Sequence, residues 1–181
     1  MKEYPVFLIM TGLYQTIYAM QNDPALTFLL RSPKEMTGAL SLLQIRNQYR
    51  DVFAIGDTEA QDMAELTKGY AFAFQALGTA YWDYRDSKDI LAAVQKLDEM
   101  LDTFVYRKIW ESLSGKERDI LVAMDEGDVK VEDVRKRTNM TSGVFSQYRE
   151  RLIAKGIMSA PRYGYVRLTL PRISEIAKSY V

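Results

Sequence analysis

The spacing of hydrophobic and polar residues predicts that this chain is built mostly of helices. Between residues 41 and 53, apolar side chains recur at helical spacing at Leu42, Ile45, Tyr49 and Phe53. Residues 70–84 are apolar or aromatic on nearly every side, which predicts a buried helix. A longer helix is expected to begin at Asp86 or Ser87. It carries apolar residues along one side at Ile90, Leu91, Val94, Leu97, Leu101, Phe104 and Val105.

The start of the chain has a different pattern. Val6–Met10 is a continuous apolar run that Thr11-Gly12 closes, and such a run predicts a strand buried on both faces, as in a parallel sheet. The rest of the chain offers few partner strands: a short piece near residues 35–39 and the strands near the C-terminus. We therefore expect that the remainder of this sheet lies outside the chain.

The last third of the chain has the order of elements found in a winged helix. Ser114-Gly115-Lys116-Glu117 is a capping box, which predicts the first helix. A short helix is expected at Val131–Thr138 and a second, longer one from Ser142 to Lys155. Residues 157–171 alternate loosely, as a hairpin does, and a last short helix follows Pro171. Helix, short helix, turn, helix and hairpin together form the winged variant of helix-turn-helix.

Charge is distributed unevenly along the chain, although the formal net charge is zero. Residues 1–109 carry 11 basic and 14 acidic side chains, whereas residues 110–181 carry 13 basic and 10 acidic ones. From Asp128 onward the basic excess is larger, 11 against 5. A local excess of this kind indicates that the C-terminal part contacts a polyanion, so double-stranded DNA is the expected partner.

Spacing along the second helix of the helix-turn-helix separates an inner and an outer face. Phe145, Tyr148 and Leu152 are expected to pack inward. Base and phosphate contacts are expected from the outer side chains Ser142, Ser146, Gln147, Arg149 and Arg151. Further phosphate contacts are expected from Lys130, Arg135, Lys136, Arg137, Arg162 and Arg167. Glu150 on the same outer face weakens this prediction, and winged helices also serve as protein-interaction modules.

Several kinds of chemistry are excluded by composition. The chain has no Cys and no His, so thiolate or imidazole metal sites, disulfides and Cys or His catalysis are absent, and no metal site is expected. Its longest apolar run, Val6–Met10, is too short to span a bilayer, and the first residues lack the pattern of a signal peptide. A cytoplasmic protein without a membrane partner is expected.

Several stretches resemble the C-terminal part of prokaryotic AAA+ ATPases, a group related to the archaeal origin-recognition and STAND ATPases. The stretches are residues 7–13, 27–31 and 67–78, together with Tyr163-Gly164 and Leu170-Pro171-Arg172 near the end. The resemblance implies a mainly α protein: a remnant of the ATPase core (residues 1–40), a helical lid-like domain (41–112) and a winged-helix domain (113–181) with a small β-hairpin wing. It also implies that Thr11 is the sensor-1 residue and that Arg31 is an arginine finger.

The chain departs from the ATPase pattern where nucleotide binding is concerned. It has no Gly-x-x-x-x-Gly-Lys-Ser/Thr loop and no upstream strand ending in acidic residues for Mg²⁺. We therefore expect a C-terminal fragment that is not an enzyme by itself and binds no cofactor, with ATP and Mg²⁺ confined to a full-length parent. Its partner would be DNA, the missing ATPase core or another protein.

Two alternatives remain open from the sequence. In the first, the winged helix packs on the lid-like domain as a protein-interaction and regulatory module, with its recognition helix buried. In the second, the chain is a stand-alone transcriptional regulator whose N-terminal helices form a dimerisation domain.

Overall fold

The chain divides into two compact units, residues 1–37 and residues 38–181. The computed structural model describes residues 9–10, 20, 23–33, 35, 37–87 and 89–181. In the first unit, a 3-10 helix, η1 (Pro24–Arg31), follows Asp23, whose carboxylate accepts a hydrogen bond from the backbone N–H of Ala25 at 2.8 Å. Most of the strand predicted at Val6–Met10 lies outside the described residues, and Ile9 and Met10 belong to no described strand.

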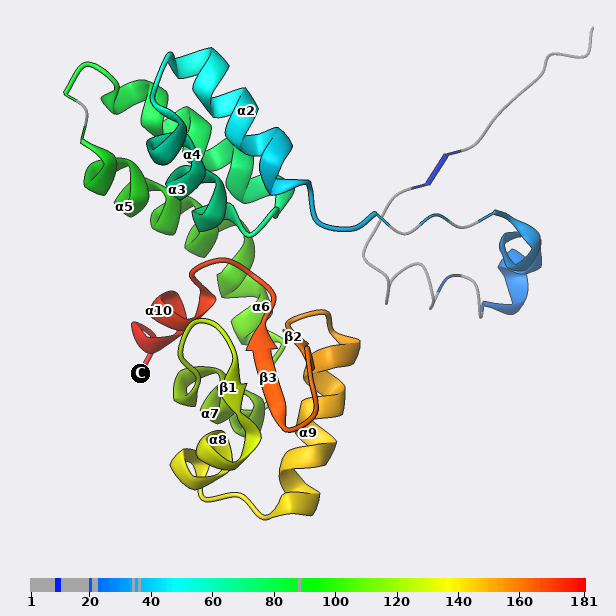
Figure 1. Cartoon of the computed structure of the whole chain (residues 1–181). Coiled ribbons are helices and arrows are strands. Elements are labelled where there is room, and N and C mark those ends of the chain that lie inside the picture. Colours follow the sequence, from blue (N-terminus) through cyan, green and yellow to red (C-terminus); the bar gives the residue numbers. More distant parts are fainter. Residues whose placement is uncertain (1–8, 11–19, 21–22, 34, 36, 88) are drawn as a thin grey trace, which may run out of the picture. The chain divides into compact units, whose positions relative to one another are not determined.

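The second unit is mainly helical with a three-stranded antiparallel sheet, which confirms the predicted mainly α class (Figure 1). Its first elements are α2 (Leu42–Phe53), α3 (Asp57–Thr67), α4 (Ala71–Tyr84), α5 (Ile90–Leu101), the π-helical turn η2 (Asp102–Tyr106) and α6 (Arg107–Glu111). Its later elements are α7 (Gly115–Ala123), β1 (Val129–Lys130), α8 (Val131–Thr138), α9 (Ser142–Ala154), β2 (Met158–Ser159), β3 (Tyr165–Leu168) and α10 (Ile173–Lys178). We call residues 42–111 the helical part and residues 113–181 the sheet part.

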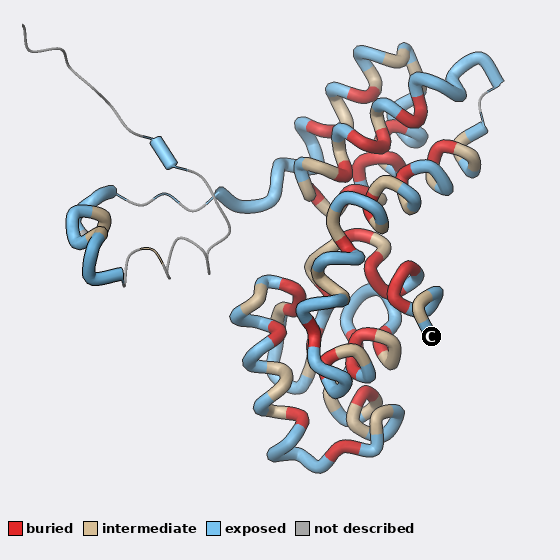
Figure 2. The backbone as a smooth tube through the Cα atoms, turned by 180° about the vertical axis from the view of Figure 1, so that it is seen from behind, coloured by how far each residue is buried: buried red, intermediate tan, exposed pale blue. Residues whose placement is uncertain are grey.

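Helices α2 to α5 pack through small and aromatic side chains, with the buried residues on the sides that face one another (Figure 2). Tyr49 on α2 is 2% exposed, and its hydroxyl donates to the backbone carbonyl oxygen of Phe74 on α4 at 2.6 Å. Burial raises the pKa of Tyr49 above its ordinary range, so the hydroxyl keeps the proton that it donates.

The prediction of a helix at residues 70–84 that is buried on nearly every side is wrong for one face. Ala73, Ala76 and Ala80 are buried, and these small residues let neighbouring helices approach one side of α4 closely. The opposite side is left uncovered, and Trp82 there is 49% exposed.

A wide turn interrupts the long helix that was predicted from Asp86 or Ser87. Within η2 the backbone N–H of Arg107 donates to the carbonyl oxygen of Asp102, which is five residues earlier instead of four. The extra residue shifts the face that points inward, so Tyr106 is the next fully buried residue after Leu101. The predicted apolar side is therefore wrong at Phe104, which is 61% exposed. It is also wrong at Leu91, which is 74% exposed on α5.

The sheet of the sheet part has the order β1-β3-β2, with β3 antiparallel to both neighbours. Val129 pairs with Val166, and Met158 pairs with Leu168. Val166 and Leu168 are buried whereas Arg167 between them is exposed, so one face of β3 covers the core and the other faces solvent. The predicted hairpin is thus present, and β1 adds a third strand that the sequence pattern did not predict.

Four side chains of the helical part bind the sheet part, three of them near its C-terminal end. The hydroxyl of Tyr106 donates to the carbonyl oxygen of Pro171, and the guanidinium of Arg172 binds the carboxylate of Asp98, with Nη2 to Oδ2 at 2.7 Å. Pro171 and Arg172 belong to the segment just before α10. The other two contacts are the ion pair of Lys68 with Glu126 and the hydrogen bond of Tyr180 with Asp102. No helix in the described ranges is long and apolar enough to cross a membrane.

Candidate nucleic-acid interface

The turn between α8 and α9 fixes where α9 begins. Asn139 ends α8 with a left-handed backbone (φ 50°), a conformation that asparagine tolerates. Thr141 caps α9, and its hydroxyl oxygen accepts a hydrogen bond from the N–H of Val144 at 3.5 Å. Phe145 and Leu152 are buried, which confirms that they face inward.

A buried carboxylate on α7 ties α9 to the rest of the sheet part. Nζ of Lys155 donates to Oε1 of Glu117 at 2.7 Å, and Oε2 of Glu117 accepts from the N–H and hydroxyl of Ser114, at 2.7 and 2.8 Å. Burial alone raises the pKa of the Glu117 carboxyl, but these hydrogen bonds outweigh it and lower the pKa below its ordinary value. Glu117 therefore stays ionised and holds the C-terminal end of α9.

The outer face of α9 is open to solvent and carries most of the predicted contact residues. Ser142, Gln147 and Arg151 are exposed, and Ser146 and Arg149 are half-buried. The structure therefore places these five side chains wholly or partly at the surface of one helix. Glu150 is exposed as well, so the same surface includes one negative charge.

Neither arginine of α9 has an ion-pair partner among the described residues, and each is held differently. The guanidinium carbon of Arg151 lies 5.2 Å from the ring centroid of Tyr148, a cation–π contact that extends the side chain along the helix. Nε of Arg149 is buried and has no hydrogen-bond partner in the described part of the chain. By helical spacing the two side chains lie on opposite flanks of the outer face.

The loop between β2 and β3 forms the tip of the hairpin and lies next to the start of α8. The N–H of Val131 donates to the carbonyl oxygen of Gly164 at 2.9 Å, and Gly164 has the positive φ (75°) that favours glycine. The guanidinium of Arg162 stacks on the ring of Tyr165, 3.8 Å from its centroid. Tyr163 is fully exposed. The tip and the α8–α9 turn lie toward the same end of the sheet part (Figure 1).

An acidic turn, Asp125-Glu126-Gly127-Asp128, binds many of the nearby basic side chains. Asp128 accepts a hydrogen bond from Nε of Arg167 at 2.6 Å and lies 3.8 Å from Nε of Arg162. Asp125 pairs with Arg137 at 2.6 Å, and the hydrogen bond from Arg137 is the main reason that the pKa of Asp125 is lowered. These three predicted phosphate contacts are therefore already partly neutralised.

The remaining predicted basic residues differ in whether they have an ion-pair partner. Lys136 pairs with Glu132 on the same helix at 2.7 Å. Lys130 and Arg135 have no ion pair within the described ranges, and Nε of Arg135 donates to the carbonyl oxygen of Met140 at 3.4 Å. Lys130 lies opposite Tyr165 in the β1–β3 pair, beside the hairpin.

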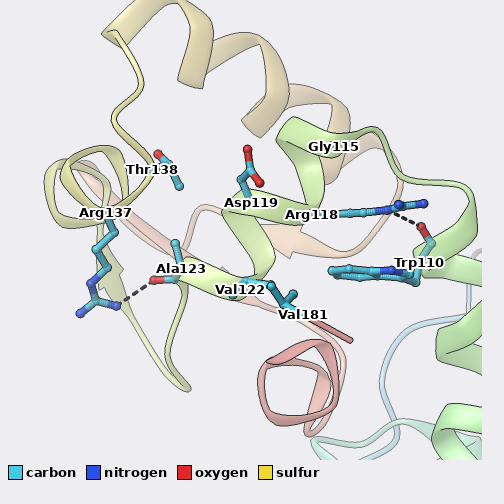
Figure 3. A pocket seen from close by; sticks show the side chains of 9 residues that line it. All are labelled: Trp110, Gly115, Arg118, Asp119, Val122, Ala123, Arg137, Thr138 and Val181. Carbon is cyan, nitrogen blue, oxygen red and sulfur yellow. Dashed lines mark hydrogen bonds between the residues drawn. The ribbon is translucent and has the colours of Figure 1, made fainter. Parts of the chain in front are cut away.

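Arg137 belongs to a different surface from α9. It lines an open groove of about 490 Å³ together with Trp110 of α6, Arg118 and Val122 of α7, and the C-terminal Val181 (Figure 3). Its guanidinium donates to the carbonyl oxygen of Ala123 at 2.8 Å. The structure therefore does not bring Arg137 together with the outer face of α9.

The two residues singled out by the ATPase resemblance lie in the N-terminal unit. Thr11 is outside the described residues. Arg31 is exposed at the end of η1. Their roles as sensor and arginine finger remain predictions.

Tyr163 and the acidic turn also belong to this surface, although the sequence pattern did not predict them as parts of it. A bulky aromatic residue in a hairpin tip beside a glycine was the available signal for Tyr163. The ion pairs of the acidic turn have no local signal, because Asp128 and Arg167 are separated by 39 positions in the sequence.

Comparison with known proteins gives a match to a family model over part of the chain. Residues 103–175 match the model of a family described as a domain of unknown function (DUF8462). The match begins within η2 and includes α6 and every strand of the sheet. No curated protein and no solved structure matches the chain.

Proposed function

We propose that residues 113–181 form a winged-helix domain that binds double-stranded DNA, with α9 in the major groove. The observation that carries this proposal is the exposed outer face of α9, flanked by two arginines without ion-pair partners in the described residues, Arg151 exposed and Arg149 half-buried. An α-helix fits the major groove, where short polar side chains and arginines contact base edges and phosphates. The element order α7-β1-α8-α9-β2-β3, with the sheet order β1-β3-β2, supports a winged helix.

The residues divide between two kinds of contact. Ser142 at the start of α9 has a short hydroxyl side chain and Gln147, one and a half turns later, has an amide, and both suit contacts with base edges. Arg149 and Arg151 on the flanks suit phosphates on either side of a groove. Lys130 beside the hairpin adds a further phosphate contact.

The packing of the sheet part favours an external partner for α9 over the lid-like helices. The segment before α10 contacts the helical part through Arg172 with Asp98 and Pro171 with Tyr106. The acidic turn contacts it through Glu126 with Lys68, and α7 through Arg118 with the carbonyl oxygen of Trp110. Helix α9 contacts α7 and β2 instead. An interaction module with a buried recognition helix would have the opposite arrangement.

We also infer that this chain does not hydrolyse ATP by itself, because its sequence has no loop of the Gly-x-x-x-x-Gly-Lys-Ser/Thr type. Cooperation with an AAA+ ATPase rests on the sequence resemblance alone. This chain could bind DNA through α9 on behalf of such an ATPase.

Fluorescence anisotropy with a labelled duplex of mixed sequence, measured at several salt concentrations, tests DNA binding. The logarithm of the association constant should fall linearly with the logarithm of salt concentration, with a slope of about −0.9 per neutralised phosphate. Arg151→Ala should weaken binding several-fold and reduce that slope by about one contact. Arg85→Ala, which removes the same charge beyond the end of α4, is the matched control.

Two results would contradict the proposal. The wild-type protein could show no saturable binding at low salt. Alternatively, Arg85→Ala could weaken binding as much as Arg151→Ala, which would mean that only the overall charge matters.

A further inference from the structure

Tyr163 is the most exposed aromatic side chain in the described part of the chain, with an exposed fraction of 102%. Isolated exposed apolar residues are common and need no explanation by themselves. The position of this one is distinctive, because it lies in the loop that joins β2 to β3, between Arg162 and Gly164. No cation covers this ring among the described residues, whereas the guanidinium of Arg162 covers the neighbouring ring of Tyr165.

The backbone of the loop that carries this ring is anchored, and basic residues lie in the loop and in the adjacent strand β1. The hydrogen bond from Val131 to Gly164 anchors one side of the tip to the start of α8. Arg162 is stacked on Tyr165, and Lys130 lies opposite Tyr165 in the adjacent strand. Lys130 has no ion pair in the described residues, whereas Arg162 is partly neutralised by Asp128. A nucleic-acid backbone attracted by Lys130, and more weakly by Arg162, would bring its bases within reach of the Tyr163 ring.

We propose that Tyr163 stacks on an unpaired base adjacent to the duplex that α9 binds. This inference rests on the proposed DNA-binding function and adds a preference for duplexes with an unpaired base. Every base has a π-face, so stacking on an aromatic ring requires no particular sequence.

The affinity gained by stacking, compared with the cost of opening a duplex, favours an unpaired base over an intact duplex as the partner of Tyr163. Stacking on an aromatic side chain contributes roughly 5- to 150-fold in affinity per base. Opening one stacked step of a duplex costs about tenfold, and kinking the duplex adds to that. A single ring therefore gains little from an intact duplex. The tyrosine hydroxyl would also lose hydration between stacked bases, whereas beside an unpaired base it remains in water.

The test compares a blunt duplex with the same duplex carrying one unpaired 2-aminopurine, by anisotropy and by 2-aminopurine fluorescence. The wild-type protein should bind the second DNA at least about fivefold more tightly and quench the probe. Tyr163→Ala should lose both effects while it keeps the affinity for the blunt duplex. Tyr163→Phe should retain both, because it keeps the ring. Arg162→Ala, the control on the same loop, should weaken binding to both DNAs by the same factor.

The outcomes separate this inference from the function on which it rests. If the wild-type protein binds neither DNA, both the proposed function and the inference are overturned. If it binds both DNAs equally and Tyr163→Ala behaves like the wild type, the inference is overturned and duplex binding stands. Loss of preference in Tyr163→Phe as well would overturn stacking, because the hydroxyl would then be the active group.

Discussion

Lys155 at the end of α9 donates a hydrogen bond to Glu117 on α7, with Nζ and Oε1 2.7 Å apart. The same carboxylate completes the capping box of α7 through Ser114. One side chain, 3% exposed, therefore starts one helix and fixes the end of another. The orientation of α9 depends on this carboxylate, although it lies away from the outer face.

Glu117→Ala should lower the free energy of unfolding by about 2 kcal/mol. Loss of a helix cap costs about 1 kcal/mol. Loss of a buried ion-pair partner adds to this cost, but less than a fully buried pair would, because Lys155 can still reach water. Urea denaturation followed by circular dichroism measures the change. Glu111→Ala, which removes an exposed glutamate from the end of α6, should change the free energy little. Equal effects of the two variants would disprove the role given to Glu117.

The stability contributed by Glu117 should depend on pH. Its pKa in the folded protein lies below the ordinary value of 4.5, so the unfolded chain takes up a proton first as the pH falls. The contribution is complete above about pH 4.5 and is lost as the pH falls through the folded-state pKa. Unfolding midpoints of the wild type and Glu117→Gln should therefore differ most near neutral pH and converge in acid. A constant difference between pH 7 and pH 3 would show that this carboxyl has no lowered pKa.

Gly69→Ala should destabilise the helical part by about 2 kcal/mol or more. Gly69 has φ +75°, and a Cβ atom there would lie 2.5 Å from the backbone oxygen of Leu40. Neither the backbone strain nor the clash can be relieved by a side-chain movement. Gly115→Ala is the matched control, because nothing lies within 4 Å of a Cβ at this position in the first turn of α7. That variant should be neutral or up to about 1 kcal/mol more stable in thermal or urea denaturation. Equal stabilities of the two variants would contradict the close approach of the Leu40 backbone oxygen to Gly69.

Asp128→Asn should strengthen DNA binding. The carboxylate of Asp128 pairs with Arg167 and lies near Arg162, so its removal leaves both guanidinium groups available to phosphates. Anisotropy titrations should give several-fold tighter binding and a salt dependence steeper by about one or two phosphate contacts. Asp119→Asn on α7 changes the net charge equally and is the control. The prediction fails if Asp119→Asn strengthens binding as much. Stability should change little, because exposed ion pairs contribute about 0–1 kcal/mol.

Local signals in the sequence were enough to predict most of the sheet part. The capping box at Ser114 and the inward positions Phe145 and Leu152 agree with the structure because each depends only on residues within one or two helical turns. The strand β1 was missed since two residues form no periodic pattern. Its place is determined by pairing with β3, more than 30 residues away.

The candidate site was only partly predictable for the same reason. Periodicity separates the outer residues of α9 from the inner ones, and Gln147 and Arg151 are exposed as expected. Which basic residues are neutralised depends on tertiary contacts, such as Arg137 with Asp125 and Arg167 with Asp128. Of the eleven residues predicted to contact DNA, those that such ion pairs neutralise lie in the hairpin and on α8.

The wide turn at η2 has a consequence for how the chain tolerates changes in length. Each residue of an α-helix rotates the chain by about 100°, so the additional residue between Leu101 and Tyr106 sets the direction in which α6 presents its side chains. Trp110 thereby packs on the ring of Tyr180, with the centroids 4.9 Å apart. An insertion or deletion of one residue in this turn would thus rotate α6 and the sheet part relative to α5 by about 100°. Loops elsewhere absorb such changes, but this helix would transmit them to the sheet part as a change of angle.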